Sequence, residues 1–336
     1  MGNKYSVSEL HKFLFDGLPV RGMMVRLTDA WQDILQRRAN NTETGPYPDA
    51  VCELLGEMTA AGVLMQSNIK FNGTLVFQIF GDGPVKVAVA EVRSDLGLRA
   101  TATINGSVAA AQTLEQLVNV DGQGRCAITL DPKDRLPGQQ SYQGVVPLNG
   151  PDGEPLEKIS QVLQQYMLQS EQLDTVIVLA ANQQVAAGLL IQRMPLKGLD
   201  NLAGATESGQ DACDANGLNE DYNRIATLAA SLQRDELLTL DVDTILRRLF
   251  WEEKLLRFVP QTGRNGPHFA CTCSRERVEG MLRSLGRDEV DSVLAERGSV
   301  DVGCDYCGAQ YHFDAIDAAQ IFTGPADLQP GTQAVQ

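Results

Sequence analysis

Residues 69–92, IKFNGTLVFQIFGDGPVKVAVAEV, hold two turn sequences between runs rich in apolar and β-branched residues. Asn72-Gly73 separates residues 69–71 from residues 74–80, and the sequence GDGP then leads into residues 85–92. Short runs joined by such turns are typical of antiparallel hairpins. The stretch therefore predicts consecutive antiparallel strands, in contrast to the helix-separated strands of a parallel sheet.

The flanking sequence extends this pattern. Asp29 can cap a helix that runs to residue 38, after a predicted strand at residues 21–28. Residues 49–68 predict a long amphipathic helix. Further elements are expected in order along the chain: a hairpin at residues 118–130 around the turn 121–124, a strand at 143–148, a helix at 155–169 and a hairpin at 175–194 around Asn182-Gln183. Hairpins between separate helices predict an α+β fold with antiparallel sheet.

Composition excludes several classes of function. The chain of 336 residues has a net charge of −15, whereas phosphate binding needs clustered Lys and Arg, so nucleic acid is not an expected partner. The N-terminus lacks the apolar region of a secretory signal, and no run of residues is long and apolar enough to span a membrane. We therefore expect a cytoplasmic protein in a reducing compartment, where cysteines stay free unless they are oxidised under stress.

The sequence contains no recognisable catalytic constellation. It has no GxSxG or HExxH motif, and no CxxC motif opens a helix in a thioredoxin-like unit. The glycine pairs at residues 81–83 and 122–124 lie between predicted strands, whereas a phosphate loop must open a helix. We therefore do not expect an enzyme.

Two cysteine pairs dominate the last third of the chain. Cys271 and Cys273 form a CxC motif, and Cys304 and Cys307 form a CxxC motif after a helical spacer. In an intracellular protein this spacing predicts a tetrahedral site with four sulfur ligands, most simply for one Zn²⁺ ion per chain. His312 offers an alternative fourth ligand, although TyrHisPhe at residues 311–313 is more typical of a short strand.

The segment around these cysteines is small. Ser274 can cap a helix over residues 275–285, residues 287–297 predict a second helix, and Asp314 can cap a third over residues 316–322. Such a unit buries too little apolar surface to fold unaided, whereas zinc binding supplies about 10–16 kcal/mol. Cysteines joined in a disulfide cannot hold the metal, so oxidation would release it. The site is therefore either a redox switch that uses this release or a structural zinc knuckle for which oxidation is incidental.

The three other cysteines have different environments. Cys52 and Cys126 fall at apolar positions of a predicted helix and strand, which favours buried structural thiols. Cys213 lies in a segment rich in Gly, Asn, Asp and Ala, where we expect exposure to oxidants.

The composition divides the chain into five parts. We expect an α+β core at residues 1–204, a flexible insertion at 205–221, a helical linker at 222–266, the zinc-binding unit at 267–322 and a disordered tail at 323–336. The linker carries two apolar stripes, one in each of two predicted helices: Ile225, Leu228 and Leu232, then Val242, Ile245, Leu246, Leu249 and Phe250.

Several motifs together resemble the redox-regulated 33-kDa heat-shock chaperone family. The most specific are the cysteine pairs with their neighbours, CTCSRER at residues 271–277 and CDYCG at residues 304–308. VRG at residues 20–22, GDGP at residues 81–84 and YMLQSEQ at residues 166–172 also resemble the family pattern. The resemblance extends from about residue 9 to residue 322. Two segments depart from the family pattern: the glycine-rich segment that contains Cys213 looks like an insertion, and the C-terminal tail looks extended.

The resemblance implies a holdase chaperone that works without ATP. The reduced, zinc-bound form would be inactive, and oxidation would join Cys271 to Cys273 and Cys304 to Cys307, with release of the metal. The zinc unit and the linker would then unfold and expose apolar surface, including the two stripes, to unfolding client proteins. Active members would be homodimers. A thiol–disulfide oxidoreductase and a zinc-stabilised protein-binding module are the alternatives.

Overall fold

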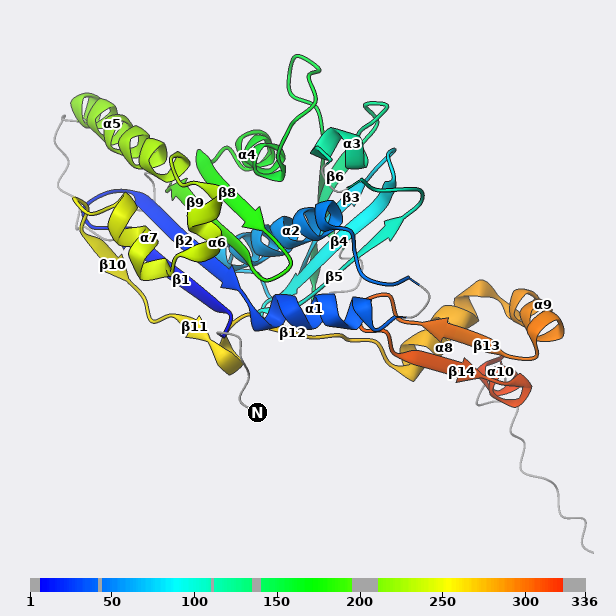
Figure 1. Ribbon diagram of the computed structural model, residues 1–336. Helices are drawn as coiled ribbons and strands as arrows, with labels where there is room; N and C mark the ends of the chain where they lie inside the picture. The colour runs from blue at the N-terminus through cyan, green and yellow to red at the C-terminus, as the bar shows by residue number, and fades with distance from the viewer. Residues whose placement is uncertain (1–6, 42–43, 110–111, 135–139, 195–210, 323–336) are drawn as a thin grey trace, which may run out of the picture. The chain divides into compact units, whose positions relative to one another are not determined.

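The computed structural model describes residues 7–41, 44–109, 112–134, 140–194 and 211–322, with side chains of the last range described from residue 220. The described part of the chain forms an α+β fold with two large sheets (Figure 1). Contacts between residues separate two compact units, Met1–Ala270 and Cys271–Gln336.

Two six-stranded sheets form the framework of the first unit. One has the order β10-β1-β2-β9-β8, with β11 also paired to β1: β1 (Glu9–Phe15), β2 (Val20–Leu27), β8 (Thr175–Ala181), β9 (Ala186–Arg193), β10 (Leu255–Arg257) and β11 (Gln261–Thr262). The other has the order β12-β5-β4-β3-β6-β7: β3 (Gly73–Phe80), β4 (Val85–Arg93), β5 (Gly97–Ile104), β6 (Arg125–Pro132), β7 (Tyr142–Pro147) and β12 (His268–Phe269). The pairs are antiparallel except β12 with β5. The predicted antiparallel fold class is therefore confirmed.

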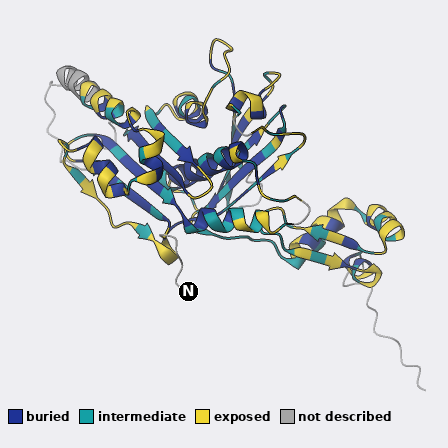
Figure 2. Ribbon diagram, in the orientation of Figure 1, coloured by how far each residue is buried: buried dark blue, intermediate teal, exposed yellow. Residues whose placement is uncertain are grey.

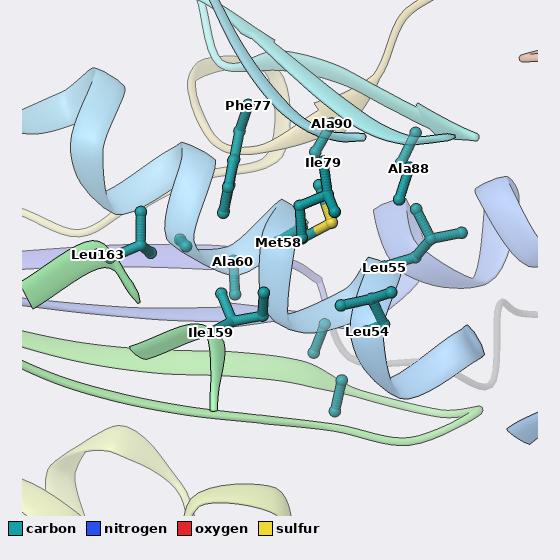
Figure 3. Packing of buried hydrophobic residues seen from close by; sticks show 14 of the residues in the cluster. Leu54, Leu55, Met58, Ala60, Phe77, Ile79, Ala88, Ala90, Ile159 and Leu163 are labelled. Atoms are coloured by element: carbon teal, nitrogen blue, oxygen red, sulfur yellow. The ribbon is translucent and has the colours of Figure 1, made fainter. Parts of the chain in front are cut away.

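Helix α2 (Asp49–Asn68) packs against strands of both sheets. Figure 3 shows Leu55 and Met58 of this helix directed toward the strands that carry Ile79 and Ala88. Most residues of α2 are buried on every side, and small residues such as Ala60 and Ala61 allow close approach. The sequence predicted an amphipathic helix, whereas α2 is buried over most of its surface and keeps only a narrow polar strip that includes Glu53 and Glu57.

Six further α-helices belong to the described part of the first unit. They are α1 (Asp29–Ala39), α3 (Leu114–Val118), α4 (Ile159–Ser170), α5 (Asp211–Ala230), α6 (Arg234–Thr239) and α7 (Val242–Leu249). Helix α5 begins inside the segment that was expected to be a flexible insertion. Residues 195–210 and 323–336 lie outside the described residues, so the expectations for them stay untested.

Helices α5 to α7 cover the outer face of the sheet that contains β1, β2, β8 and β9 (Figures 1 and 2). Phe250, which follows α7, lies 5.1 Å from Phe15, ring centre to ring centre, in an edge-to-face arrangement. Arg26 of β2 donates hydrogen bonds to the carbonyl oxygens of Leu237, Leu238 and Leu240 at 3.0, 2.8 and 3.2 Å. This guanidinium therefore satisfies the carbonyl groups at the end of α6 and holds that helix on the sheet.

Two predicted hairpins are wrong. Residues 69–72 lie outside the strands, and β3 begins at Gly73, which pairs with Pro132 of β6. Val118 ends helix α3, so β6 pairs with β3 and β7 and has no partner at residues 118–120. The turn at residues 121–124 instead packs on the β3–β4 turn, where Asp82 accepts hydrogen bonds from the backbone N–H groups of Asp121 and Gln123.

Smaller differences concern helix ends and missed elements. Helix α4 begins at Ile159, four residues later than the expected start at 155. Asp29 is the first residue of α1 and not its cap, and the hydroxyl of Ser8 accepts hydrogen bonds from the N–H groups of Thr28 and Ala30. Sequence reasoning did not identify β1, β5 or α6.

The second unit consists of α8 (Arg275–Leu285), α9 (Arg287–Arg297), β13 (Val300–Gly303), β14 (Gln310–Phe313) and α10 (Ala315–Phe322). The three helices follow the predictions, with Ser274 capping α8 and Asp314 accepting hydrogen bonds from the first N–H groups of α10. The core is small and centres on the fully buried Phe313.

Candidate metal centre

The four cysteines come from two short segments of the second unit. Cys271 and Cys273 lie in the extended chain just before α8, where the Ser274 cap fixes the start of the helix. Cys304 and Cys307 lie in the turn between β13 and β14. The backbone N–H of Cys304 donates to the carbonyl of Ala309 at 2.9 Å, and Gly308 adopts a φ of 74°, which glycine accommodates without strain. The hairpin therefore holds the second pair in a tight loop.

All four sulfur atoms lie within 4.8 Å of one another. The Sγ atoms of Cys271 and Cys304 are 3.7 Å apart, and those of Cys273 and Cys307 are 3.2 Å apart. Four sulfurs about 2.3 Å from a tetrahedral zinc ion are separated by about 3.8 Å. The cluster therefore has the ligand type, the number and the approximate spacing that such an ion requires, and all four residues are half-buried.

Burial is the main reason why the pKa values of the Cys304 and Cys307 thiols are raised. Thiolates crowded at this distance also repel one another, which opposes ionisation of the whole set. A divalent cation reverses this balance, because a metal ion lowers the pKa of the thiols that bind it. The four thiols are therefore expected to ionise readily only when a metal ion lies between them.

Tyr311 of β14 also reaches the cluster. Its hydroxyl donates a hydrogen bond to Sγ of Cys273 at 3.1 Å, and this bond is the main cause that raises the pKa of Tyr311 to about 12. The phenol therefore keeps its proton at neutral pH. Sequence reasoning placed residue 311 in a strand but missed the contact, because it depends on the β13–β14 register that pairs Tyr311 with Val302.

His312 does not join the cysteine cluster. Alternation along β14 directs it elsewhere, and its Nδ1 lies 2.6 Å from a carboxylate oxygen of Asp301. Among the described residues, the group with metal-ligating potential contains the four cysteines and no histidine. The geometry favours a four-sulfur site over the alternative with one histidine.

Arg275 ties together the elements around the cysteines. Its guanidinium lies 4.2 Å from the centre of the Phe313 ring, donates to the carbonyl of His312 at 2.9 Å and pairs with Asp317 at 2.8 Å. One side chain therefore joins the start of α8 to β14 and α10. The first cysteine pair is thus connected to the strand that follows the second pair.

The apolar stripes of the linker are buried on the sheet in this state. The set expected to bind clients comprises Ile225, Leu228, Leu232, Val242, Ile245, Leu246, Leu249 and Phe250, and all but the partly buried Leu228 are at most 6% exposed. They contact Phe13, Phe15 and residues of β9 within one cluster. The expected docking of these stripes on the core is seen in the structure, and its dependence on reduced thiols stays a prediction.

The remaining cysteines are separate from the cluster. Cys52 and Cys126 are buried, as predicted, and burial raises the pKa of each thiol to about 12. Both are therefore protonated and unreactive at neutral pH. The side chain of Cys213 lies outside the described residues.

Comparisons with known proteins agree on one family. A family model described as Hsp33 protein matches residues 8–314. Proteins named 33 kDa chaperonin are 43% identical in Chromobacterium violaceum, over 94% of this chain and 93% of the relative, and 41% identical in Neisseria meningitidis, over 93% and 90%. A crystal structure of a 33 kDa chaperonin from Thermotoga maritima matches with a TM-score of 0.69 at 18% identity, over 94% of this chain and 97% of that one. This last match supports the fold.

Proposed function

Because the chain belongs to the Hsp33 family, we propose that this chaperone is a redox-regulated holdase that captures unfolding proteins without ATP. The observation that supports this most directly is the convergence of four thiols on one point in a unit with a very small core. The same four thiols can hold a metal when they are reduced and can form disulfides when they are oxidised.

In the reduced state, Cys271, Cys273, Cys304 and Cys307 would hold one Zn²⁺ ion and the protein would be inactive. Binding of structural zinc contributes about 10–16 kcal/mol, whereas whole domains are stable by about 5–15 kcal/mol. The second unit would therefore depend on the metal for its fold. The docked linker would keep the apolar stripes away from clients.

Oxidation would remove the ligands. With a hydroperoxide as oxidant, two thiolates, one hydrogen peroxide and two protons give one disulfide and two water molecules. By resemblance to the family, the disulfides would be Cys271–Cys273 and Cys304–Cys307. Sulfur atoms of opposite motifs also lie near each other, at 3.7 Å for Cys271 and Cys304 and 3.2 Å for Cys273 and Cys307, so mapping of the disulfides by mass spectrometry is a direct test of the pairing.

Loss of the metal would then unfold the second unit and release the linker. The stripes of α5 and α7 would be exposed as apolar patches that bind unfolding client proteins. We propose that the active form is a homodimer, that it has no enzymatic activity, and that it works in the cytoplasm under oxidative stress. Among the described residues, no helix is both long and apolar enough to cross a bilayer.

The test follows zinc release and suppression of client aggregation in one reduced sample that is titrated with peroxide at raised temperature. The proposal predicts that about one zinc ion leaves each chain as the activity appears. The C213S variant serves as control, because it keeps all four ligands. Zinc that leaves without a gain in activity would favour a zinc-stabilised binding module, and catalytic reduction of insulin would favour an oxidoreductase.

A further inference from the structure

Tyr311 places its hydroxyl 3.1 Å from Sγ of Cys273. The strand pairing fixes this position, since β14 is bound along its length to β13 and Phe313, two residues later, is fully buried. The ring of Tyr311 packs against the small apolar core of the second unit. The phenol is therefore held by its own framework and does not reach the sulfur by chance rotation of a free side chain.

A hydrogen bond to a thiolate has two chemical effects. It orients the sulfur lone pairs, and it withdraws electron density from the sulfur, which lowers its nucleophilicity. Attack by the sulfur on a peroxide oxygen is the first step of oxidation, so a thiolate that accepts a hydrogen bond reacts more slowly. A bond of this kind to a charged group is able to change a rate or equilibrium by roughly tenfold.

We propose that Tyr311 is a positioning residue that protects Cys273 and so sets the amount of oxidant at which the cysteine site opens. This inference rests on the proposed redox function and concerns the same site. In the reaction, a thiolate attacks one oxygen of hydrogen peroxide, the O–O bond breaks, and hydroxide leaves as the sulfenic acid forms. A second thiolate then attacks the sulfur of the sulfenic acid and displaces a second hydroxide to give the disulfide. Overall, two thiolates lose two electrons, and the peroxide takes up these electrons and two protons to become two water molecules. Tyr311 raises the barrier for Cys273 in the first of these steps.

The variant Y311F removes the hydroxyl and keeps the ring that packs in the core. Y142F is the matched control, since Tyr142 is an exposed tyrosine of β7 in the first unit. Circular dichroism of the reduced, zinc-loaded full-length proteins checks that both variants fold. The test then uses two measurements, one of the hydrogen bond and one of the oxidant threshold.

The first measurement is the absorption spectrum of the full-length reduced protein loaded with Co²⁺ in place of zinc. A hydrogen bond stabilises the sulfur orbitals, so its loss in Y311F should shift the sulfur-to-cobalt charge-transfer band to longer wavelength. Y142F should match the wild type. A role confined to packing would leave the band unchanged, because phenylalanine fills the same space.

The second measurement is the rate of zinc release at fixed peroxide, together with the rate at which each cysteine is alkylated. We expect Y311F to release zinc about three- to tenfold faster, with the gain in alkylation concentrated at Cys273. If the wild type releases zinc on oxidation and Y311F has the same rates and the same spectrum, the proposed role of Tyr311 is wrong, whereas the proposed redox function stands. A wild type that keeps its zinc under oxidant would overturn the proposed function, and the threshold with it.

Discussion

Gly22 lies on β2 directly opposite Phe13 on β1. A Cβ atom at this position would come within 2.2 Å of the Phe13 ring. That ring contacts Phe15 and, at a centroid distance of 6.3 Å, Phe250 at the end of α7. Because Gly22 has no side chain, the Phe13 ring can lie over β2 and contact Phe15 and Phe250, and the linker docks on this aromatic cluster.

The variant G22A tests this dependence. The added methyl group should displace Phe13 and destabilise the first unit by about 1–3 kcal/mol, as overpacking usually does. We expect faster hydrogen exchange in α7 of the reduced protein, because Phe250 loses its contact with Phe13 and keeps only that with Phe15. G280A is the control, since nothing lies within 4 Å of a Cβ atom at Gly280. Unchanged exchange in α7 of G22A would show that docking does not depend on Phe13.

Glu57 of α2 should make the stability of the protein depend on pH, because its pKa is raised. Burial and the neighbouring Glu53 raise its pKa to about 8, although Arg234 and Lys158 oppose the shift. Because the folded protein holds this proton more tightly than the unfolded chain, the free energy of unfolding should fall as the pH rises from about 4.5 to about 8. The slope should reach about 1.4 kcal/mol per pH unit.

The variant E57Q cannot lose this proton. Its stability should therefore depend less on pH than that of the wild type within the same window, while both proteins behave alike below the pKa of the unfolded carboxyl. Chemical denaturation at several pH values measures the difference. Parallel pH profiles for the two proteins would contradict the proposed protonation of Glu57.

At the scale of elements, strand β12 lies between the linker and the first cysteine pair in the sequence. It follows the linker and ends two residues before Cys271. It pairs in parallel with β5, and the N–H of Ala270 donates to the carbonyl of Leu98 at 2.9 Å. The guanidinium of Arg37 lies 4.2 Å from the centre of the Phe269 ring. Unfolding that begins at the cysteines must therefore separate β12 from β5 before it reaches the linker.

The variant F269A should weaken this barrier. The loss of the cation–π contact and of partial burial should cost at least about 1 kcal/mol. After zinc loss, the linker should then begin to exchange at a lower temperature than in the wild type. F258A, which alters an exposed aromatic residue after β10, is the control. A shared onset temperature for F269A and wild type would mean that β12 does not limit the spread of unfolding.

The elements differ in how well the sequence predicts them. Helices α8, α9 and α10 were predicted closely. The caps of α8 at Ser274 and of α10 at Asp314 are local signals. The strand at residues 125–130 was also predicted, as β6, but the hairpin arms expected at residues 69–71 and 118–120 were wrong. Gly73 instead pairs with Pro132, and such a pairing depends on residues far apart in the chain. Helix α2 was predicted in its bounds but not in its burial, which only the second sheet explains.

The candidate site shows the same division. Cysteine spacing predicted the four residues that the fold brings together, because metal-binding motifs are short and local. The contact of Tyr311 with Cys273 could not be predicted in this way, since it joins the strand of one hairpin to a segment 38 residues earlier. The docked state of the linker was predicted, but the three carbonyl groups held by Arg26 were not.

At the scale of the whole molecule, the two units differ in what stabilises them. The first has a large core built from two sheets and α2, whereas the second has a small cluster around Phe313. Removal of the metal should therefore affect them unequally. The second unit should unfold, the linker helices should follow, and the two sheets and α2 should remain folded.

Hydrogen exchange with mass spectrometry, measured as zinc is released by oxidation, tests this account most directly. We predict that residues 271–322 lose protection first and residues 222–257 next, while α2 and β3 keep theirs, and that reductant with added zinc restores the original pattern. A linker that stays protected after all zinc has left would contradict the account. Loss of protection in α2 and β3 together with the linker would contradict it as well, because it would indicate global unfolding.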